Sequence, residues 1–143
     1  MIDITEKKKV HRTASAEGTI ILTEGSIKAI EEGTVKKGDP IQAAEISAIQ
    51  AVKRTPYDIP HCHPIPIESI DVDILMEEDK IKVSCTVKAV YKTGVEMEAL
   101  SGVNAALLTI WDMVKYLEKD EDGQYPSTNI TDIIVTEKKK ELK

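Results

Sequence analysis

Residues 92–115 read KTGVEMEALSGVNAALLTIWDMVK, a short turn followed by a long apolar segment. Apolar side chains recur every three or four positions, as they do on the buried face of an α-helix. The recurring residues are Leu100, Val103, Leu107, Ile110, Trp111 and Val114. Glu96 and Glu98 stand at the start of the segment, and Asp112 and Lys115 stand near its end. We therefore predict a helix over residues 95–118 with charged groups at both ends.

The four charged residues of this helix have two interpretations. In the first, burial and neighbouring charges shift their pKa values, as happens in catalytic and binding sites. In the second, Asp112 and Lys115 form an ordinary surface pair, while Glu96 and Glu98 stabilise the helix N-terminus through the helix dipole. This segment alone favours the second interpretation.

A β-hairpin is predicted immediately before this helix. Ile70, Val72 and Ile74 alternate with polar residues, EEDK at 77–80 forms the turn, and the alternation returns over residues 81–87. Two further strands are predicted, over residues 10–22 and 129–136. Prolines at positions 56, 60, 64 and 66 predict an extended loop before the hairpin.

Two helices are predicted between the first strand and this loop. The first covers residues 26–32, and Gly33 is a suitable C-terminal stop. The second covers residues 40–54, with Asp39 as N-cap and Pro40 at the first helical position. The resulting order of strand, two helices, hairpin, helix and strand predicts an α+β sandwich with helices packed on one face of an antiparallel sheet.

The overall composition indicates one globular domain over residues 1–143, with flexible ends at 1–9 and 138–143. The chain is 41% hydrophobic and 31% charged, and its net charge of −6 argues against nucleic-acid binding. We find no signal peptide and no apolar run of membrane-spanning length, so no membrane association is expected. Two isolated cysteines do not form a disulfide framework, and a cytoplasmic location follows.

The proline-rich loop contains His61, Cys62 and His63 in a row. All three residue types bind metals, but a structural zinc site uses four ligands in spaced pairs, so we predict no metal site. A histidine held among prolines to donate a hydrogen bond to an anion or a heterocycle fits the pattern better. A loop histidine with nothing to bind is the remaining interpretation.

Anion binding is also indicated, more weakly, by basic residues elsewhere. Lys37 precedes Gly38 and a helix N-terminus, which attracts anions through free N–H groups and the macrodipole. The spacing is not that of a phosphate-binding Walker A loop, and a solvated lysine is the ordinary alternative. Arg12 and Lys53 are further candidates for phosphate contact.

Several motifs together resemble one known family. The segments are MIDIT, KKGDP, AIQAVKRT, IPHCHPIPI, DVDI, TGVEMEAL and AALLTIWDMVK. They occur in the order and at nearly the spacing of the MoaC family, the cyclic pyranopterin monophosphate synthases of molybdenum cofactor biosynthesis, and cover most of residues 1–118. The resemblance implies a ferredoxin-like α+β subunit and a hexamer built as a trimer of dimers.

The resemblance also implies a lyase activity on a GTP-derived substrate. A cyclised dihydroguanosine triphosphate would be converted into cyclic pyranopterin monophosphate, a pterin, with release of pyrophosphate. The positions that match the family's catalytic residues are Asp112, Lys115 and Lys37. The positions that match its substrate contacts are His61, Cys62, His63, Met97, Glu98 and Arg12. A rearrangement and elimination needs no redox cofactor, while assistance by a divalent cation such as magnesium stays open.

Two departures from the family pattern affect the assignment of these residue roles to this chain. Residue 61 is His, where the family more usually has an apolar residue. The chain also ends in VTEKKKELK rather than a glycine-rich tail, which leaves the role of Lys138 open. The competing function is a non-catalytic ferredoxin-like module that binds a small anion, for which Asp112 and Lys115 would be unnecessary.

Helix geometry predicts how the two ends of the 95–118 helix are used. Glu98 and Asp112 are 14 residues apart, or about 21 Å at 1.5 Å per residue, and face nearly the same way. One nucleotide-sized substrate does not reach both within a chain. We therefore predict a homo-oligomer with active sites shared between subunits. Gly102, Ala105 and Ala106 would allow close approach either of a partner or of the chain's own sheet.

Overall fold

The computed structural model describes residues 1–142 and contains four strands and three helices. In chain order these are β1 (Val10–Ile21), α1 (Glu24–Glu32), α2 (Pro40–Asp58), β2 (Ile67–Met76), β3 (Lys80–Tyr91), α3 (Glu96–Glu118) and β4 (Asn129–Glu141). The strands form one sheet in the order β2-β3-β1-β4, and each neighbouring pair is antiparallel. This order and connectivity are those of the ferredoxin-like fold, so the predicted fold class is confirmed.

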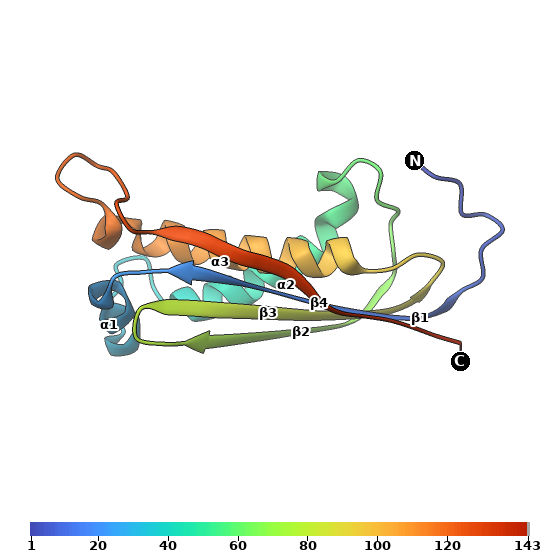
Figure 1. Cartoon of the computed structure of the whole chain (residues 1–143), viewed down its shortest axis with the longest axis horizontal. Helices are drawn as coiled ribbons and strands as arrows, with labels where there is room; N and C mark the ends of the chain where they lie inside the picture. Colours follow the sequence, from blue (N-terminus) through green and yellow to red (C-terminus); the bar gives the residue numbers. More distant parts are fainter. Residues whose placement is uncertain (143) are drawn as a thin grey trace.

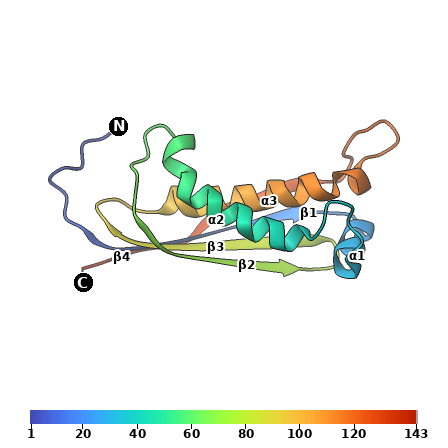
Figure 2. The same ribbon diagram turned by 180° about the vertical axis from the view of Figure 1, so that it is seen from behind.

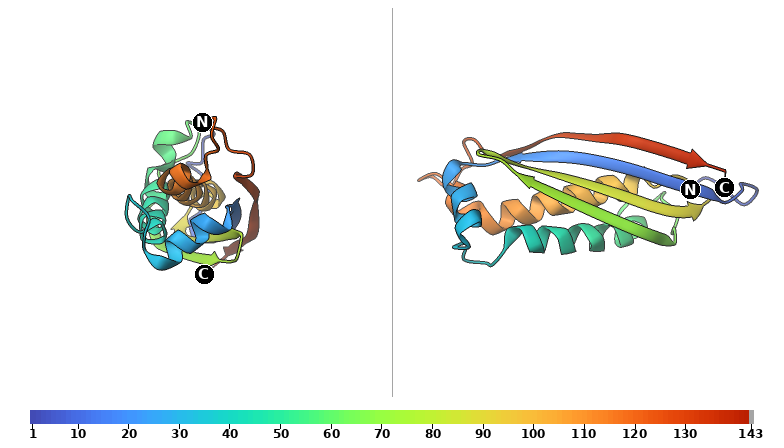
Figure 3. Two further views of the ribbon diagram at one scale, coloured as in Figure 1. Left: turned by 90° about the vertical axis from the view of Figure 1, so that its left-hand side faces the viewer. Right: turned by 90° about the horizontal axis from the view of Figure 1, so that it is seen from below.

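The sheet and the helices form two layers. In the right-hand view of Figure 3 the strands lie on one side, and α2 and α3 run side by side along the other. Figures 1 and 2 show α1 at the end where α3 finishes, while both chain termini lie at the end where α3 begins. No helix within residues 1–142 combines the length and the apolar character needed to cross a membrane.

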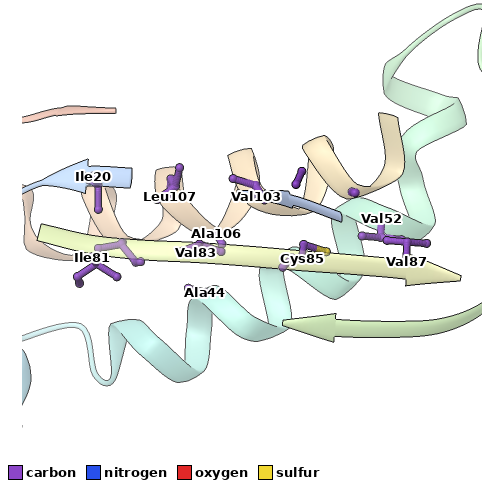
Figure 4. Close-up of a cluster of buried hydrophobic side chains, with 14 of the residues drawn as sticks. Ile20, Ala44, Val52, Ile81, Val83, Cys85, Val87, Val103, Ala106 and Leu107 are labelled. Carbon is purple, nitrogen blue, oxygen red and sulfur yellow. The ribbon is translucent and has the colours of Figure 1, made fainter. Parts of the chain in front are cut away.

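Alternation along the strands produces the buried face of the sheet. Ala14 pairs with Val87 and Ala16 with Cys85, and all four are fully buried beneath the helices. Figure 4 shows how β3 side chains meet those of α2 and α3. The intervening residues of β1 point to the opposite face, which no helix covers.

The small residues of α3 pack inside the subunit. A Cβ on Gly102 would lie 2.8 Å from Cys85 Sγ and 3.0 Å from a methyl group of Val52, so only glycine allows α3 to approach β3 and α2 this closely. Ala106 is fully buried and Ala105 is half-buried. Of the two roles considered for this stretch, close packing against the chain's own sheet is therefore the one observed at Gly102 and Ala106.

Helix α2 extends further than the sequence predicts. It was expected to end at residue 54, with an extended loop from Pro56, but it continues through Pro56 to Asp58. Pro56 lies in the last turn, where its missing N–H removes a single backbone hydrogen bond. In the same turn the Thr55 hydroxyl donates to the carbonyl of Ala51 at 2.8 Å, and the Ile59 N–H donates to the carbonyl of Thr55 at 2.9 Å.

Strand β4 is also longer than predicted. The expected strand ended at residue 136 and was followed by a flexible end over 138–143, yet β4 continues to Glu141. The lysines suggested a solvated tail, but β1 begins at Val10 and offers backbone partners for residues 138–141, ending with the pair His11 and Glu141. Residue 143 lies outside the described residues. The N-terminal segment 1–9 contains no helix, and strand β1 begins only at Val10.

Candidate functional site

The three residues predicted to be catalytic lie together at the C-terminal half of α3. Lys37 Nζ lies 2.9 Å from Asp112 Oδ2, and Lys115 Nζ lies 3.2 Å from Asp112 Oδ1. Lys37 Nζ also donates to the backbone carbonyl of Asp112 at 3.2 Å. We call Lys37, Asp112 and Lys115 the lysine–aspartate cluster. One carboxylate thus lies between two ammonium groups from different elements.

Local structure explains how this cluster forms. Asp112 and Lys115 are three positions apart on α3 and therefore lie on the same face of the helix. Lys37 comes from the loop between α1 and α2, which ends where Asp39 caps α2 by accepting hydrogen bonds from the N–H groups of Ile41 and Gln42. Gly38 in that loop has φ of 115°, a backbone conformation that L-residues rarely adopt.

The two lysines change the acidity of the carboxylate between them. The hydrogen bond from Lys37, and then that from Lys115, lower the pKa of Asp112 below its ordinary value. The side chains of Lys37, Asp112 and Lys115 are 45%, 54% and 42% exposed, so a substrate can reach all three. The cluster therefore presents an ionised carboxylate and two proton donors on an open surface.

The predicted substrate contacts form a second group at the other end of α3. His61, Cys62, His63, Met97 and Glu98 line one small cavity of about 130 Å³. We call these five residues the histidine–glutamate group. The first three come from the loop after α2, and the last two come from the first turn of α3. Burial raises the pKa of the Cys62 thiol, as does the nearby charge of Glu98.

Glu98 is the most buried acid of this second group. It is 2% exposed, and this burial raises its pKa, with a smaller contribution from the charge of Glu96. Glu96 also lines the cavity, and its Oε1 lies 3.2 Å from Lys138 Nζ, close enough for an ion pair but poorly aligned for a hydrogen bond. Strand β4 thus places Lys138 beside the start of α3.

Arg12 lies at this same end of the molecule but not in the cavity. It is 7% exposed, and its guanidinium donates to the carbonyls of Tyr91 at 3.5 Å and Lys92 at 3.2 Å. It lines a larger hollow of about 640 Å³ at the end of the sheet. Lys140 is directly opposite Arg12 in the β1–β4 pair and shares its face of the sheet. Arg12, Lys138 and Lys140 place positive charge at this end of the sheet, where Glu68 and Glu141 also line the hollow.

The N-terminal segment contacts the histidine–glutamate group. His63 donates from Nε2 to the carbonyl of Ile2 at 2.8 Å, and Lys92 Nζ donates to the carbonyl of Thr5 at 3.1 Å. A hollow beside these contacts is lined by Met1, Ile2, Ile4, Lys7, His61, His63 and Thr93. The segment before β1 therefore forms part of the wall around the predicted substrate contacts.

The structure does not bring the two groups together. The lysine–aspartate cluster lies where α3 ends, and the histidine–glutamate group lies where it begins (Figure 1). Glu98 and Asp112 are separated by about 21 Å of helix. Lys37 and Arg12, both predicted to contact phosphate, are likewise at opposite ends. Each end of one chain thus carries part of the predicted set.

A metal site at His61, Cys62 and His63 would need these side chains to converge on one point. Within residues 1–142, no three or more His, Cys, Asp or Glu side chains are placed to hold a metal ion together. His63 instead contacts the backbone carbonyl of Ile2.

Sequence reasoning missed Glu118, which is 4% exposed at the end of α3. Its carboxylate accepts hydrogen bonds from the hydroxyls of Thr23 at 2.7 Å and Thr128 at 2.6 Å, and from that of Ser26. Burial raises the pKa of Glu118, but these hydrogen bonds outweigh burial and lower it overall. A signal was available, because a carboxylate near a helix C-terminus opposes the dipole and requires other partners.

Comparison with known proteins decides the family. The MoaC family model matches residues 1–141. The chain belongs to the MoaC family. A protein of Pyrococcus furiosus named "probable cyclic pyranopterin monophosphate synthase" is 55% identical over 141 residues, which are 99% of this chain and 90% of that protein. A protein of Thermoplasma acidophilum with the same name is 54% identical, with 98% of each chain covered.

A third MoaC relative carries a different name. The protein of Methanothermobacter thermautotrophicus is named "probable cyclic pyranopterin monophosphate synthase accessory protein", and it is 52% identical over 98% of this chain and 88% of its own. The resemblance inferred from the motifs is thus confirmed, and it extends through β4, beyond the residues whose motifs suggested it.

Proposed function

We propose that this chain is a cyclic pyranopterin monophosphate synthase, a lyase of molybdenum cofactor biosynthesis. Its substrate would be 3',8-cyclo-7,8-dihydroguanosine 5'-triphosphate, and its products cyclic pyranopterin monophosphate and pyrophosphate. Relatives that carry this name match almost the whole chain. The observation that carries the proposal is the lysine–aspartate cluster, in which Asp112 is within 2.9 Å of one ammonium group and 3.2 Å of another.

The lysine–aspartate cluster supplies the groups that this chemistry needs. Converting a guanine-derived ring system into a pterin requires several proton transfers, and positioned acids and bases typically accelerate each about 10²- to 10⁴-fold. Lys37 and Lys115 would donate or accept protons, and Asp112 would hold both ammonium groups in place. The lowered pKa of Asp112 keeps it ionised for this role at neutral pH.

The cationic end of the sheet suits the phosphate groups. Closing the cyclic phosphate breaks the bond between the α-phosphorus and the oxygen of the leaving pyrophosphate, on which negative charge develops. Arg12, Lys138 and Lys140 share that end of the sheet, and His63 lies in the adjacent loop. Cations placed around a leaving group stabilise its developing charge. Glu98, with its raised pKa, would hydrogen-bond the heterocycle.

A complete site of this kind requires two subunits. The two groups of residues lie at opposite ends of α3, so a substrate that touches both would have to lie between neighbouring chains. We therefore propose a homo-oligomer, a hexamer built as a trimer of dimers, with shared active sites. Contact between the start of one α3 and the end of another would bring the cationic end of one subunit to the lysine–aspartate cluster of the next.

The proposal includes no resident cofactor. Magnesium prefers carboxylate oxygens, but Asp112 is paired with two lysines and Glu96 with Lys138, so neither carboxylate is free to bind it. We assign any magnesium ion to the phosphates of the substrate. A cytoplasmic location belongs to the same proposal, because Cys62 and Cys85 are both free thiols, as a reducing compartment maintains them.

Pyrophosphate release tests the function directly. Purified protein is mixed with the cyclised nucleotide, with and without a chelator, and pyrophosphate and pterin formation are followed. Catalytic release of both products supports the proposal, and release that survives the chelator supports a mechanism without a required metal. Stoichiometric binding without pyrophosphate release would favour the alternative, a ferredoxin-like anion-binding module.

A further inference from the structure

Tyr116 makes a contact that the catalytic proposal does not use. Its hydroxyl accepts a hydrogen bond from the backbone N–H of Lys36 at 2.9 Å. The ammonium group of Lys36 also lies over the Tyr116 ring, 5.1 Å from its centroid. Tyr116 is partly buried and its ring packs against the hydrophobic core. A rigid side chain of α3 therefore contacts the residue immediately before Lys37.

The loop that carries Lys37 is held at several points. Val35 is buried, with 7% exposure, and its carbonyl accepts a hydrogen bond from the Gly38 N–H at 3.1 Å. The Thr34 N–H donates to the carbonyl of Ala29 at 2.9 Å. These contacts fix the loop to itself, to α1 and to the core. The Tyr116 hydroxyl joins its backbone to α3, the helix that carries the rest of the lysine–aspartate cluster.

Helix geometry makes the two contacts a matched pair. Asp112 and Tyr116 are four positions apart on α3 and so lie one turn apart on the same face. They contact consecutive loop residues, since Asp112 binds the side chain of Lys37 and Tyr116 binds the backbone of Lys36. A lysine side chain has four flexible bonds, and without a fixed backbone it would sample many positions besides the one on Asp112.

We propose that Tyr116 is a positioning residue, whose hydroxyl fixes the backbone at Lys36 so that the ammonium group of Lys37 lies on Asp112. The inference rests on the proposed function for its catalytic consequence. The geometric part, that Tyr116 acts on Asp112 through Lys37, can be tested without any turnover.

The test is Tyr116→Phe, which removes the hydroxyl and keeps the ring that packs on the core and under Lys36. The Asp112 carboxyl is titrated by NMR on carbon-13-labelled aspartate, with Asp112→Asn used for assignment. Lys37 and Lys115 are the charged groups that face Asp112. Without the Tyr116 hydroxyl the loop backbone is held less firmly, which weakens the contact between Lys37 and Asp112. The pKa of Asp112 should therefore rise towards its ordinary value of 3.8. We expect kcat to fall roughly fivefold, the value of one hydrogen bond.

A double-mutant cycle separates positioning from general stability. In a Lys37→Ala background, Tyr116→Phe should cause no further rise in the pKa of Asp112, because two residues that act through one contact have non-additive effects. A further rise in that background would overturn the inference, and so would an unchanged pKa in Tyr116→Phe alone. If the wild-type protein releases no pyrophosphate, the proposed function fails while the titration still decides the role of Tyr116.

Tyr125→Phe is the matched control. Tyr125 packs edge-on against Trp111, with ring centroids 5.2 Å apart, so it lies near the same end of α3. Its hydroxyl makes no hydrogen bond to any side chain or backbone group that the structure describes among residues 1–142. Removing this hydroxyl should leave the pKa of Asp112 and kcat unchanged. An equal shift in both variants would assign the effect to general loosening of the helix end.

Discussion

Lys37 Nζ lies 2.9 Å from Asp112 Oδ2, although 75 positions separate the two residues in the chain. The contact joins the loop before α2 to the end of α3, and Lys115 completes it from the same helix. An isolated i,i+3 pair on a helix is an ordinary surface feature. The second lysine, brought in by the fold, distinguishes this cluster from such a pair and leads to the first prediction.

Replacing Asp112 or Lys115 by alanine should abolish turnover while the protein remains folded. Both side chains are about half exposed, so their removal costs little packing, whereas loss of an acid or base should slow product formation at least about 100-fold. The measurements are the rate of pyrophosphate release and the thermal unfolding midpoint. Lys28→Ala is the control, because Lys28 forms a comparable i,i+4 pair with Glu32 on α1. Near-normal turnover in folded Lys115→Ala would remove Lys115 from the mechanism.

Substitutions of Arg12, Lys37 and His63 should each weaken substrate binding. A lost hydrogen bond to a charged phosphate typically costs about 1.5–3 kcal/mol, so Kd should rise roughly tenfold or more. Calorimetry at increasing salt should show falling affinity, because salt screens these interactions, and pyrophosphate should compete for the site. Lys82→Ala, on the sheet face without helices and outside the hollow that Arg12 lines, should bind normally. Unchanged affinity after all three replacements would place the phosphates elsewhere, for example at Lys53.

Shared active sites predict complementation between inactive variants. Glu98→Ala and Asp112→Ala proteins are mixed under conditions that exchange subunits. If each site takes its two ends from two chains of a dimer, random exchange leaves about a quarter of the sites intact, and about that fraction of wild-type activity should return. Each variant exchanged with itself is the control. A mixture that stays inactive after proven exchange would mean that each site is contained within one chain.

Glu118→Gln should destabilise the protein at neutral pH. It should also make the free energy of unfolding depend less on pH in the acid range. The folded state lowers the pKa of Glu118 below its ordinary 4.5, so its contribution is present above 4.5 and is lost as pH falls towards the folded pKa. An amide accepts the three hydroxyls less well than a carboxylate, and the expected cost at pH 7 is about 1–3 kcal/mol.

Denaturant unfolding measured from pH 7 down to pH 3 tests this prediction. The wild-type protein should lose stability more steeply than Glu118→Gln below pH 4.5, so that the two curves converge. Glu121→Gln is the matched control, because Glu121 is an exposed acid in the loop that follows α3. Parallel curves for wild type and Glu118→Gln would show that the Glu118 hydrogen bonds do not depend on its charge.

Much of the fold could be predicted because the relevant signals are local. Alternation in β2 and β3, the period of α3, the Asp39 cap and the Gly33 stop each depend on residues within a few positions of one another. The lengths of α2 and β4 could not be predicted in this way. Pro56 is tolerated because it lies in the last turn of α2, where only one backbone hydrogen bond is lost, and residues 138–141 form a strand because β1 is available to pair with them.

The sequence by itself determined the element types, their order along the chain and the identities of the polar residues at each end of α3. Tertiary structure decided which of these residues meet. Lys37 reaches Asp112, Lys138 reaches Glu96, and Glu118 is surrounded by three hydroxyl groups through contacts between distant segments. The reason is physical, since periodicity reports which face of an element is buried, while a side chain's partners and pKa depend on which other elements pack against that face.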